Sequence, residues 1–513
     1  MKNIFKIVFL AFVSMLIVNV SFAEKYLGEI NKPKPTIKQT KAEPCKPATG
    51  STDLDINNVR ARINTGGDMW WDFTQAKYEI PRGSRKTSMF AAALWIGGLD
   101  INKQLKLAAQ RFRSGGVDFF TGPLTQNGTA AVDAETCNEW DRHFKITRRE
   151  VEEFIADPTN PAKQTDVIKN WPSSGNRSKG QTGYLAPFFD INGDYEYDYT
   201  IGEYPYYDLN NSLCPTNPDK KNPDGTWKPL EPTYETTEGD GNPKVTGGIL
   251  VDQVLKGDLT LWWVFNDKGN IHSESNGDPI GLEIRAQAFG FSTNDEINNM
   301  TFYTYEIINR STYTLTETYF SQWVDTDLGY AFDDYVGCDV QRGLGYSYNG
   351  RATDGAGQYY AYEGNPPAIG VDFFQGPYMD PDGLDNPKYK ADGTQICDVS
   401  INGVNFGNGL IDDERFGMRR FLYYNNSPGP TGEPEAAMDY YNYLKGIWRD
   451  NRKMTYGGDG HGTGNNATQI PADFMFPGDS DPLHWGTGCG ADPIPGKIWT
   501  EETANNAPAD RRF

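Results

Sequence analysis

The fifteen residues DTDLGYAFDDYVGCD, from position 325 to 339, include five aspartates and directly follow TYFSQWV, a run typical of a β-strand. Carboxylates this close in sequence repel one another unless an opposite charge compensates them. Calcium binds six to eight hard oxygen ligands from carboxylates, carbonyls and water, so it would remove that repulsion. The pattern predicts a calcium site, with a solvated acidic loop as the alternative. The expected ligands are Asp325, Asp327, Asp333, Asp334 and Asp339.

A second acidic stretch, DINGDYEYD at 190–198, begins like a calcium loop of the EF-hand type. It has oxygen ligands at the first, third and fifth positions. Tyr195 replaces the glycine of position six, however, and Ile201 replaces the glutamate of position twelve. A calcium loop of another type and a plain acidic turn therefore both remain open. The candidate ligands are Asp190, Asn192, Asp194 and Asp198.

Motifs for catalysis are few. The chain has only four histidines and contains no HExxH zinc motif, no P-loop and no dinucleotide fingerprint. The fragments GHGTG at 460–464 and KTSMFAA at 86–92 are similar to motifs of subtilisin-like proteases. In that family the serine follows the histidine, whereas here the order is reversed, so a protease is disfavoured.

A glycosidase needs two carboxylates that are close in space, and 69 acidic residues could supply them anywhere in the chain. Trp70–Trp71 and Trp262–Trp263 are candidates for stacking on sugars. Adjacent side chains of a strand point to opposite faces, however, and tryptophan more often packs in a core. An extracellular hydrolase or a carbohydrate-binding protein is thus the alternative to a noncatalytic protein.

The N-terminus has the layout of a secretory signal peptide, here residues 1–23. Two lysines precede an apolar run from Ile7 to Val20, and small residues flank the expected cleavage point. This run is too short for a membrane anchor, and no later segment of the sequence approaches the ~18 apolar residues of a spanning helix. The sequence predicts a secreted or cell-surface protein without a transmembrane segment.

The acidic composition narrows the range of partners. The formal charge is −21 for the whole chain and −23 without residues 1–23, which contain two lysines and no acid. Such a surface repels phosphate backbones and anionic lipids, so nucleic acid is disfavoured as a partner and cations are favoured. Six cysteines, an even number in an exported chain, favour disulfides without indicating their pairing.

Short alternating runs rich in glycine, proline and aromatic residues predict a mainly β chain. We expect antiparallel β-sandwich modules with long Gly/Asp/Asn-rich loops and a few short helices. The expected segments are a Pro/Lys-rich linker at 24–52, a β-rich domain with the second acidic stretch at 53–244, a β-sandwich at 245–350 and a loop-rich region with one helix at 351–513.

The clearest expected strands share a high content of β-branched and aromatic residues: 88–96, 259–265, 282–289, 301–308 and 312–324. The first is expected to be a buried strand. In the run at 282–289, LEIRAQAF, apolar and polar residues alternate, which predicts a half-buried strand with one wet face.

Two helices are expected. Thr147 and Glu150 have the spacing of a capping box, which predicts a short helix at 147–155. Pro434 at a first turn, followed by apolar residues at helical spacing, predicts another helix at 433–450.

Several segments together resemble one family. Besides the aspartate loop, they are ALWIGGLD at 93–100, LVDQVLKGDLTLWWVFNDKGN at 250–270, TFYTYEIINRS at 301–311 and NFGNGLIDDERFGMRRF at 405–421. They resemble large, mostly uncharacterised secreted proteins of Bacteroidota, many of which end in a type IX secretion sorting domain. The resemblance implies no catalytic residues. Because such relatives continue beyond the point where this chain stops, it implies further domains of a longer parent chain.

These observations favour a secreted or cell-surface structural or adhesive protein with calcium-stabilised loops and no identified catalytic activity. Its expected partners are an extracellular glycan or protein and the further domains of its parent chain. A hydrolase would instead need a deep pocket with converging carboxylates and exposed tryptophans.

Overall fold

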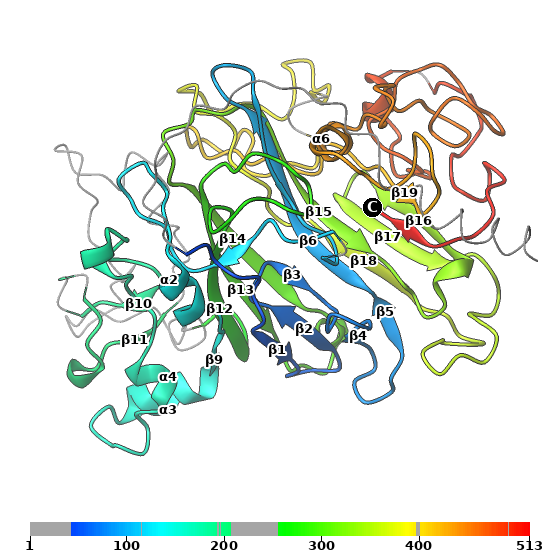
Figure 1. Cartoon of the computed structure of the whole chain (residues 1–513). Coiled ribbons are helices and arrows are strands. Elements are labelled where there is room, and N and C mark those ends of the chain that lie inside the picture. Colours follow the sequence, from blue (N-terminus) through cyan, green and yellow to red (C-terminus); the bar gives the residue numbers. More distant parts are fainter. Residues whose placement is uncertain are drawn as a thin grey trace, which may run out of the picture. The chain divides into compact units, whose positions relative to one another are not determined.

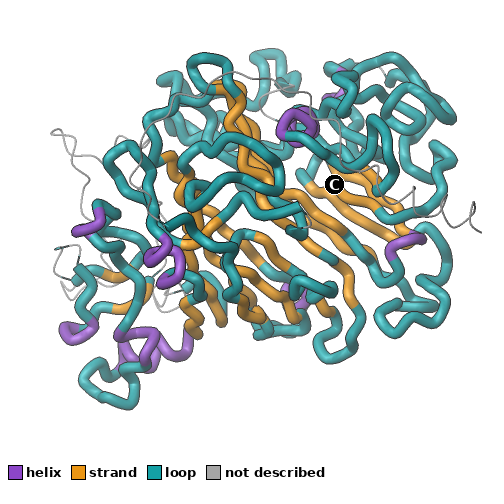
Figure 2. Tube along the Cα trace, viewed as in Figure 1, coloured by secondary structure: helices purple, strands orange, loops and turns teal. Residues whose placement is uncertain are grey.

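Antiparallel β-sheets dominate the fold, as the sequence predicts, and long loops connect their strands (Figures 1 and 2). The computed structural model describes residues 43–113, 115–191, 194, 196–206, 255–396, 401–490 and 492–513. The α-helices in this part of the chain are α2 (Ala134–Glu139), α3 (Arg148–Ala156), α4 (Asp166–Lys169) and α6 (Ala437–Leu444). None of the helices in these residues has the length and apolar character needed to cross a membrane.

The larger sheet has ten strands and joins segments that are far apart in the sequence. Its order is β19-β20-β15-β6-β3-β2-β4-β5, with β1 paired to β2 and β7 paired to β6. The strands are β1 (Ser51–Leu54), β2 (Arg60–Asn64), β3 (Asp68–Met69), β4 (Tyr78–Glu79), β5 (Thr87–Met89), β6 (Ala91–Leu99), β7 (Leu105–Ala109), β15 (Thr316–Asp325), β19 (Tyr424–Asn425) and β20 (Arg511–Arg512). Strands from all three expected ranges, 53–244, 245–350 and 351–513, thus pair within one sheet.

The second sheet has five strands in the order β14-β13-β12-β8, with β9 also paired to β12. Its strands are β8 (Phe120–Thr121), β9 (Phe144–Thr147), β12 (Leu259–Asn266), β13 (Leu282–Gly290) and β14 (Phe302–Asn309). Two smaller sheets contain β10 (Phe188–Phe189) with β11 (Tyr204–Pro205), and β16 (Asp334–Asp339) with β17 (Leu344–Asn349) and β18 (Ala368–Asp372). The strands expected at 259–265, 282–289 and 301–308 therefore form within one residue of their predicted ends.

The two large sheets pack against each other around one hydrophobic core. Leu261 and Trp263 of β12 belong to this core together with Leu94 of β6. The alternate residues Trp262 and Val264 face a separate core on the other side of β12. Both faces of this strand are buried because successive side chains point in opposite directions. Two antiparallel sheets around a shared core are the arrangement of a β-sandwich.

The prediction of one wet face on β13 is wrong. Glu283 and Arg285 are 0% and 5% exposed because the neighbouring chain covers them with hydrogen-bond partners. The Leu124 N–H donates to Glu283 at 2.9 Å, and Arg310 and Arg285 pair with the same carboxylate at 2.8 and 3.1 Å. Burial alone would raise the pKa of Glu283, but the two arginines lower it overall. The alternation of apolar and polar residues therefore predicts the strand correctly here, but it does not predict which face is exposed to solvent.

The opposite face of β6 lies against the C-terminal part of the chain. Trp95 packs in a core with residues of α6, and its ring lies 4.8 Å from that of Tyr440. The helix is shorter than the expected range 433–450. It ends at Leu444, and Gly446 then adopts a φ of +68°, a left-handed conformation that turns the chain away from the helix axis.

The helix expected at 147–155 is confirmed as α3. Thr147 caps it by accepting from the Glu150 N–H, and the Glu150 side chain accepts in return from the Thr147 N–H at 2.9 Å. This reciprocal pair satisfies two N–H groups that the first helical turn leaves without partners.

The folded part begins before the boundary expected near Asp53. Cys45 is 1% exposed and forms a disulfide with Cys137, with a Cα–Cα distance of 5.9 Å. Cys489 is also disulfide-bonded, whereas Cys338 is a buried free thiol. Residues 43–52 are thus held to the sandwich by a covalent bond rather than extended as a linker.

Candidate metal centre

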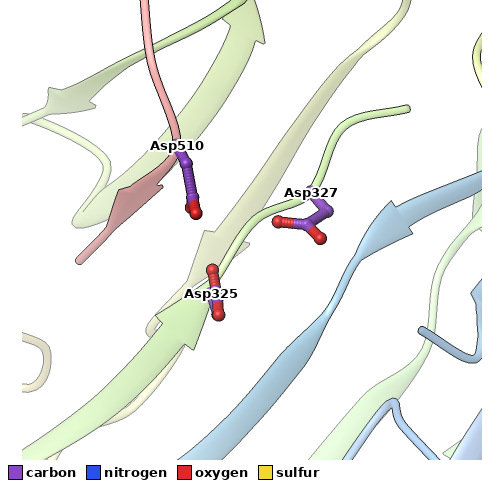
Figure 3. Close-up of side chains that lie close together, drawn as sticks. All are labelled: Asp325, Asp327 and Asp510. Atoms are coloured by element: carbon purple, nitrogen blue, oxygen red, sulfur yellow. The ribbon is translucent and has the colours of Figure 1, made fainter. Parts of the chain in front are cut away.

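Antiparallel pairing of β15 with β20 brings two distant aspartates together. Asp325, the last residue of β15, is in register with Arg512, and Asp510 directly precedes β20. Asp327 lies just beyond β15, and its carboxylate approaches those of the other two aspartates (Figure 3). One carboxylate oxygen from each aspartate lies within 4.8 Å of the other two. We call Asp325, Asp327 and Asp510 the carboxylate cluster.

The spacing of the carboxylate cluster fits a single ion. Two oxygens that each lie ~2.4 Å from a calcium ion are at most ~4.8 Å apart. Among the residues that the structure describes, no other three His, Cys, Asp or Glu side chains bring ligand atoms this close together. Carboxylate oxygens are hard ligands, so the chemistry of the cluster suits calcium better than a thiophilic metal.

One arginine partly compensates the three carboxylates. Arg512 Nε lies 3.3 Å from Asp325 Oδ2, and its Nη1 lies 3.0 Å from Asp510 Oδ1. Burial raises the pKa of Asp325 well above its usual range; Arg512 opposes this rise, and the neighbouring carboxylates add to it. Burial and Asp510 raise the pKa of Asp327 to about 7. Arg512 alone therefore does not offset the burial and mutual repulsion of the three carboxylates, which protons or a divalent cation would relieve.

A buried oxygen of the cluster has no partner. Asp325 is 1% exposed, and its Oδ1 accepts no hydrogen bond. The hydroxyl of the adjacent Thr326 is also buried without a partner. Buried polar atoms are nearly always hydrogen-bonded, because an isolated one loses its hydration without compensation. The unpartnered Asp325 Oδ1 is the position at which a cation would supply the missing interaction.

The structure brings together two of the five aspartates expected in the first loop, and it places the other three elsewhere. Asp333 and Asp334 are buried at the start of β16, where backbone N–H groups hold one oxygen of each. Asp339 lies at the far end of β16 and pairs with Arg342 at 2.5 Å. Asp339 is thus separated from the carboxylate cluster by the length of the strand.

The second acidic stretch forms turns in the part that the structure describes. Asp194 accepts from the Glu196 N–H at 2.7 Å, and Asp198 accepts from the Thr200 N–H at 2.8 Å. Asn192 lies outside the described residues, so its expected role as a ligand stays a prediction. The charges of the candidate ligands Asp190 and Asp194 act on a nearby buried carboxylate, Glu203.

Glu203 is that buried carboxylate, and it lies five residues beyond the second acidic stretch. It is 0% exposed and accepts from the Ile191 N–H at 3.1 Å and from the Asp198 N–H at 2.7 Å. Burial raises the pKa of Glu203, and the charges of Asp190 and Asp194 raise it further. The loop thus folds around its own glutamate.

The tryptophan pairs are not available for stacking on sugars. Trp70, Trp71, Trp262 and Trp263 are 4%, 6%, 1% and 1% exposed, and the two members of each pair belong to different cores. Trp262 and Trp263 of β12 thus confirm the expectation that adjacent tryptophans of a strand point to opposite faces, and Trp70 and Trp71, which follow β3, are also packed inside the protein.

The two fragments that are similar to protease motifs do not form an accessible catalytic site. Ser88 is 1% exposed within β5. His461 Nε2 lies 2.9 Å from Asp450 in a glycine-rich loop. The histidine thus has a carboxylate partner, while the serine hydroxyl is enclosed in the sheet and inaccessible to a substrate.

A polar cleft of about 600 Å³ lies near the cluster. Arg111 lines it and pairs with two carboxylates of the cleft, Glu274 at 2.8 Å and Glu433 at 2.5 Å. Arg512 also lies 3.6 Å from Glu433, so ion pairs connect the cleft with the carboxylate cluster. Among the described residues, no aromatic side chain lines this cleft, and its acids are engaged by arginines.

No family model matches the chain, and neither does any curated protein or solved structure. The chemistry of the site is therefore inferred from its own geometry. Asp510 is the member of the cluster that sequence reasoning missed, because only the pairing of β15 with β20 places it beside Asp325.

Proposed function

We propose that this chain is a secreted or cell-surface structural or adhesive protein whose β-sandwich is stabilised by calcium. The observation that supports it is the carboxylate cluster, which brings one oxygen of each of three aspartates within 4.8 Å of the others and in which Asp325 Oδ1 is buried without a partner. A calcium ion there would join the end of β15 to the C-terminal strand, two segments that are far apart in the sequence. Calcium would thus link the folding of distant parts of the chain.

Secretion fits this role. The signal peptide at 1–23 predicts export, and the disulfide between Cys45 and Cys137 suits an oxidising compartment. Extracellular modules bind calcium with dissociation constants of roughly 10⁻⁴–10⁻³ M, so a site with three carboxylates is adequate there. The resemblance to secreted Bacteroidota proteins leads us to propose the same origin, with further domains in a longer parent chain and an extracellular glycan or protein as partner.

The alternative of an extracellular hydrolase or a carbohydrate-binding protein has less support. The four candidate tryptophans are buried, and the polar cleft has no aromatic lining among the described residues. Its carboxylates Glu274 and Glu433 are engaged in ion pairs with Arg111 rather than facing each other across a substrate-sized gap.

Thermal unfolding of residues 24–513 in EDTA and in millimolar calcium tests the proposal. We expect a higher midpoint with calcium and the loss of that rise in Asp510→Asn, which removes a ligand charge at nearly constant volume. Asp479→Asn is the matched control, since Asp479 is exposed and lies outside the carboxylate cluster. An identical midpoint with EDTA and with calcium would refute the proposed function.

A further inference from the structure

β14 is the terminal strand of the five-stranded sheet, where it pairs with β13 (Figure 1). It is eight residues long, and all its residues are partly or fully exposed. An open edge strand can pair with another chain, so soluble proteins usually protect such edges with proline, lysine or a cover. The sequence of β14, FYTYEIIN, has neither proline nor lysine. β18, an edge of the three-stranded sheet, is directly preceded by Pro366 and Pro367 and thus has the protection that β14 lacks.

The backbone groups of β14 that point away from β13 follow from the hydrogen bonds of the pair. The Arg310 N–H donates to Gly281 O at 2.9 Å at the end of β13 and β14. Hydrogen-bonded residues alternate along an antiparallel pair, so the even-numbered residues of β14 bond to β13. The N–H and C=O groups of Tyr303, Tyr305 and Ile307 therefore point away from the sheet. Among the described residues, none of these groups has a hydrogen-bond partner.

The side chains on the core face of β14 are apolar or aromatic. Tyr303 and Tyr305 are partly buried against the core between the two large sheets, and Ile307 on the same face is 38% exposed. An apolar side chain at the open end of this face would lose further contact with water if another strand continued the sheet.

The opposite face of β14 has one charge of each sign beside it. Lys256 Nζ donates to the Thr304 hydroxyl at 2.7 Å. Glu306 is in register with Arg285 of β13 and pairs with it at 3.2 Å. A cation and a carboxylate thus lie near positions 304 and 306, which are neighbours on this face of the strand.

We propose that β14 pairs antiparallel with β14 of a second copy of this chain, so that the five-stranded sheets of two copies join into one continuous sheet. A twofold axis pairs the same surface of both copies. The odd-numbered residues must face each other, because their backbone groups point outward and a shift by one residue would turn the apolar face to the wrong side. Registers centred on Thr304, Tyr305 and Glu306 meet this condition.

Charge complementarity favours the register centred on Tyr305. A centre on Glu306 would place this carboxylate opposite its own copy, where like charges repel. A centre on Thr304 would place Glu306 opposite the apolar Phe302. With the centre on Tyr305, Glu306 of the second copy lies opposite Thr304 and therefore beside the ammonium group of Lys256.

The same register places Ile307 opposite Tyr303 of the second copy on the core face. Pairs of an aromatic and a β-branched residue stabilise adjacent strands. The outward N–H and C=O groups of Tyr303, Tyr305 and Ile307 would all gain partners. None of these residues belongs to the carboxylate cluster, so the pairing goes beyond the proposed function and does not require calcium.

Sedimentation equilibrium of residues 24–513 at about 1 to about 100 μM, in EDTA and in calcium, tests the pairing. We expect a dimer in both conditions. Ile307→Pro removes an outward N–H without removing a bond to β13, so it should raise the Kd of the dimer at least about tenfold. Ala368→Pro is the matched control at the start of the exposed edge strand β18 and should leave the Kd unchanged.

Circular dichroism checks the fold of each variant. A wild type that is monomeric over the whole range would overturn the pairing, and the edge of β14 would then be open to a strand of a different protein. A dimer that a folded Ile307→Pro variant retains would also overturn it. A dimer that forms only in calcium would do the same, because an ion rather than the strand edge would then join the copies.

Cysteine cross-linking tests the register even if Ile307→Pro does not fold. Opposite residues of a non-hydrogen-bonded pair have Cα atoms about 4.5 Å apart, which a disulfide can bridge. Under mild oxidation we expect a covalent dimer when Thr304→Cys and Glu306→Cys chains are mixed, and little from either alone. A covalent dimer from one variant alone would overturn the register centred on Tyr305. No covalent dimer in the mixture would overturn the pairing of β14 with its own copy.

Discussion

Two buried aspartates at the ends of core strands differ in where their compensation comes from. Asp267 directly follows β12 and is 0% exposed, and its carboxylate accepts three backbone N–H groups, from Ile280, Gly281 and Leu282, at 2.6, 2.9 and 2.6 Å. Asp325 ends β15 and is 1% exposed, yet its Oδ1 has no partner. The backbone therefore donates hydrogen bonds to both carboxylate oxygens of Asp267, whereas Asp325 Oδ1 accepts none.

Asp118 is a second buried aspartate whose two carboxylate oxygens both accept hydrogen bonds. It is 0% exposed and accepts from the N–H groups of Ala109 and Glu274 at 3.0 and 3.1 Å and from the Ser275 hydroxyl. The sandwich thus has the means to satisfy a buried aspartate fully. Where it does not, in the loop after β15, the missing interactions point to a ligand from outside the chain.

The largest expected effect on stability comes from disrupting the hydrogen bonds of Asp267. Asp267→Asn places an amide where three N–H donors converge, so we expect the free energy of unfolding to fall by about 3 kcal/mol, equally with EDTA and with calcium. Urea denaturation measures this change. Asp278→Asn is the control in the same loop, since that side chain is 68% exposed and should cost less than ~1 kcal/mol. A loss that calcium reverses would show that Asp267 also depends on an ion.

Asp325→Asn should behave in the opposite way. In EDTA the substitution removes a poorly compensated buried charge, so we expect no loss of stability or a small gain. In calcium at 100 times the dissociation constant, the variant should lack the ~2.7 kcal/mol that binding adds to the wild type. Denaturation under both conditions tests whether the difference from wild type changes sign. An equal loss of unfolding free energy in EDTA and in calcium would mean that Asp325, like Asp267, is stabilised by the protein alone and not by an ion.

The pH dependence of stability should distinguish carboxylates that are fully hydrogen-bonded from those that have an unpartnered oxygen. The folded state retains a proton on Asp334, whose pKa burial raises to about 10, whereas the unfolded chain has lost it above pH ~4. Because the folded state binds more protons, stability in EDTA should fall as the pH rises from 7 to 9, by roughly 1 kcal/mol per unit. The pKa of Asp327 is also raised, to about 7, so calcium bound at the carboxylate cluster would displace a proton there, and the slope near pH 7 should become shallower.

Denaturation at pH 7, 8 and 9, with and without calcium, measures these slopes. The window lies above the range of the buried His143, whose pKa burial lowers to about 3 and which therefore affects stability only at lower pH. Asp334→Asn should reduce the slope in EDTA by the contribution of one proton, and Asp325 and Asp327, whose pKa values are also raised, account for the remainder. Parallel slopes with and without calcium would indicate that no ion displaces protons from the carboxylate cluster.

The sequence predicts the strands better than their surroundings. The apolar runs at 259–265 and 282–289 form β12 and β13 because β-branched and aromatic residues suit an extended, packed backbone. The burial of Glu283 depends on Arg310 and on the N–H of Leu124, which are distant in sequence. Local alternation cannot indicate partners of that kind.

The same limit applies to the candidate metal centre. Asp325 and Asp327 were found because acidic residues crowd one short loop. Asp510 was missed because its place depends on the pairing of β20 with β15. The density of acidic residues thus locates two of the three aspartates of the carboxylate cluster, and strand pairing determines the third.

Asp339 gives the smallest expected effect and the sharpest test of that limit. It has the same acidic sequence context as Asp325, but it pairs with Arg342, whose side chain is 73% exposed. Exposed ion pairs of this type contribute little, so Asp339→Asn should change the free energy of unfolding by less than ~0.5 kcal/mol. The calcium-induced rise in the unfolding midpoint should stay at the wild-type value. A smaller calcium-induced rise would mean that the ion site extends along β16. The density of acidic residues in the sequence would then predict its ligands better than the geometry of the carboxylate cluster does.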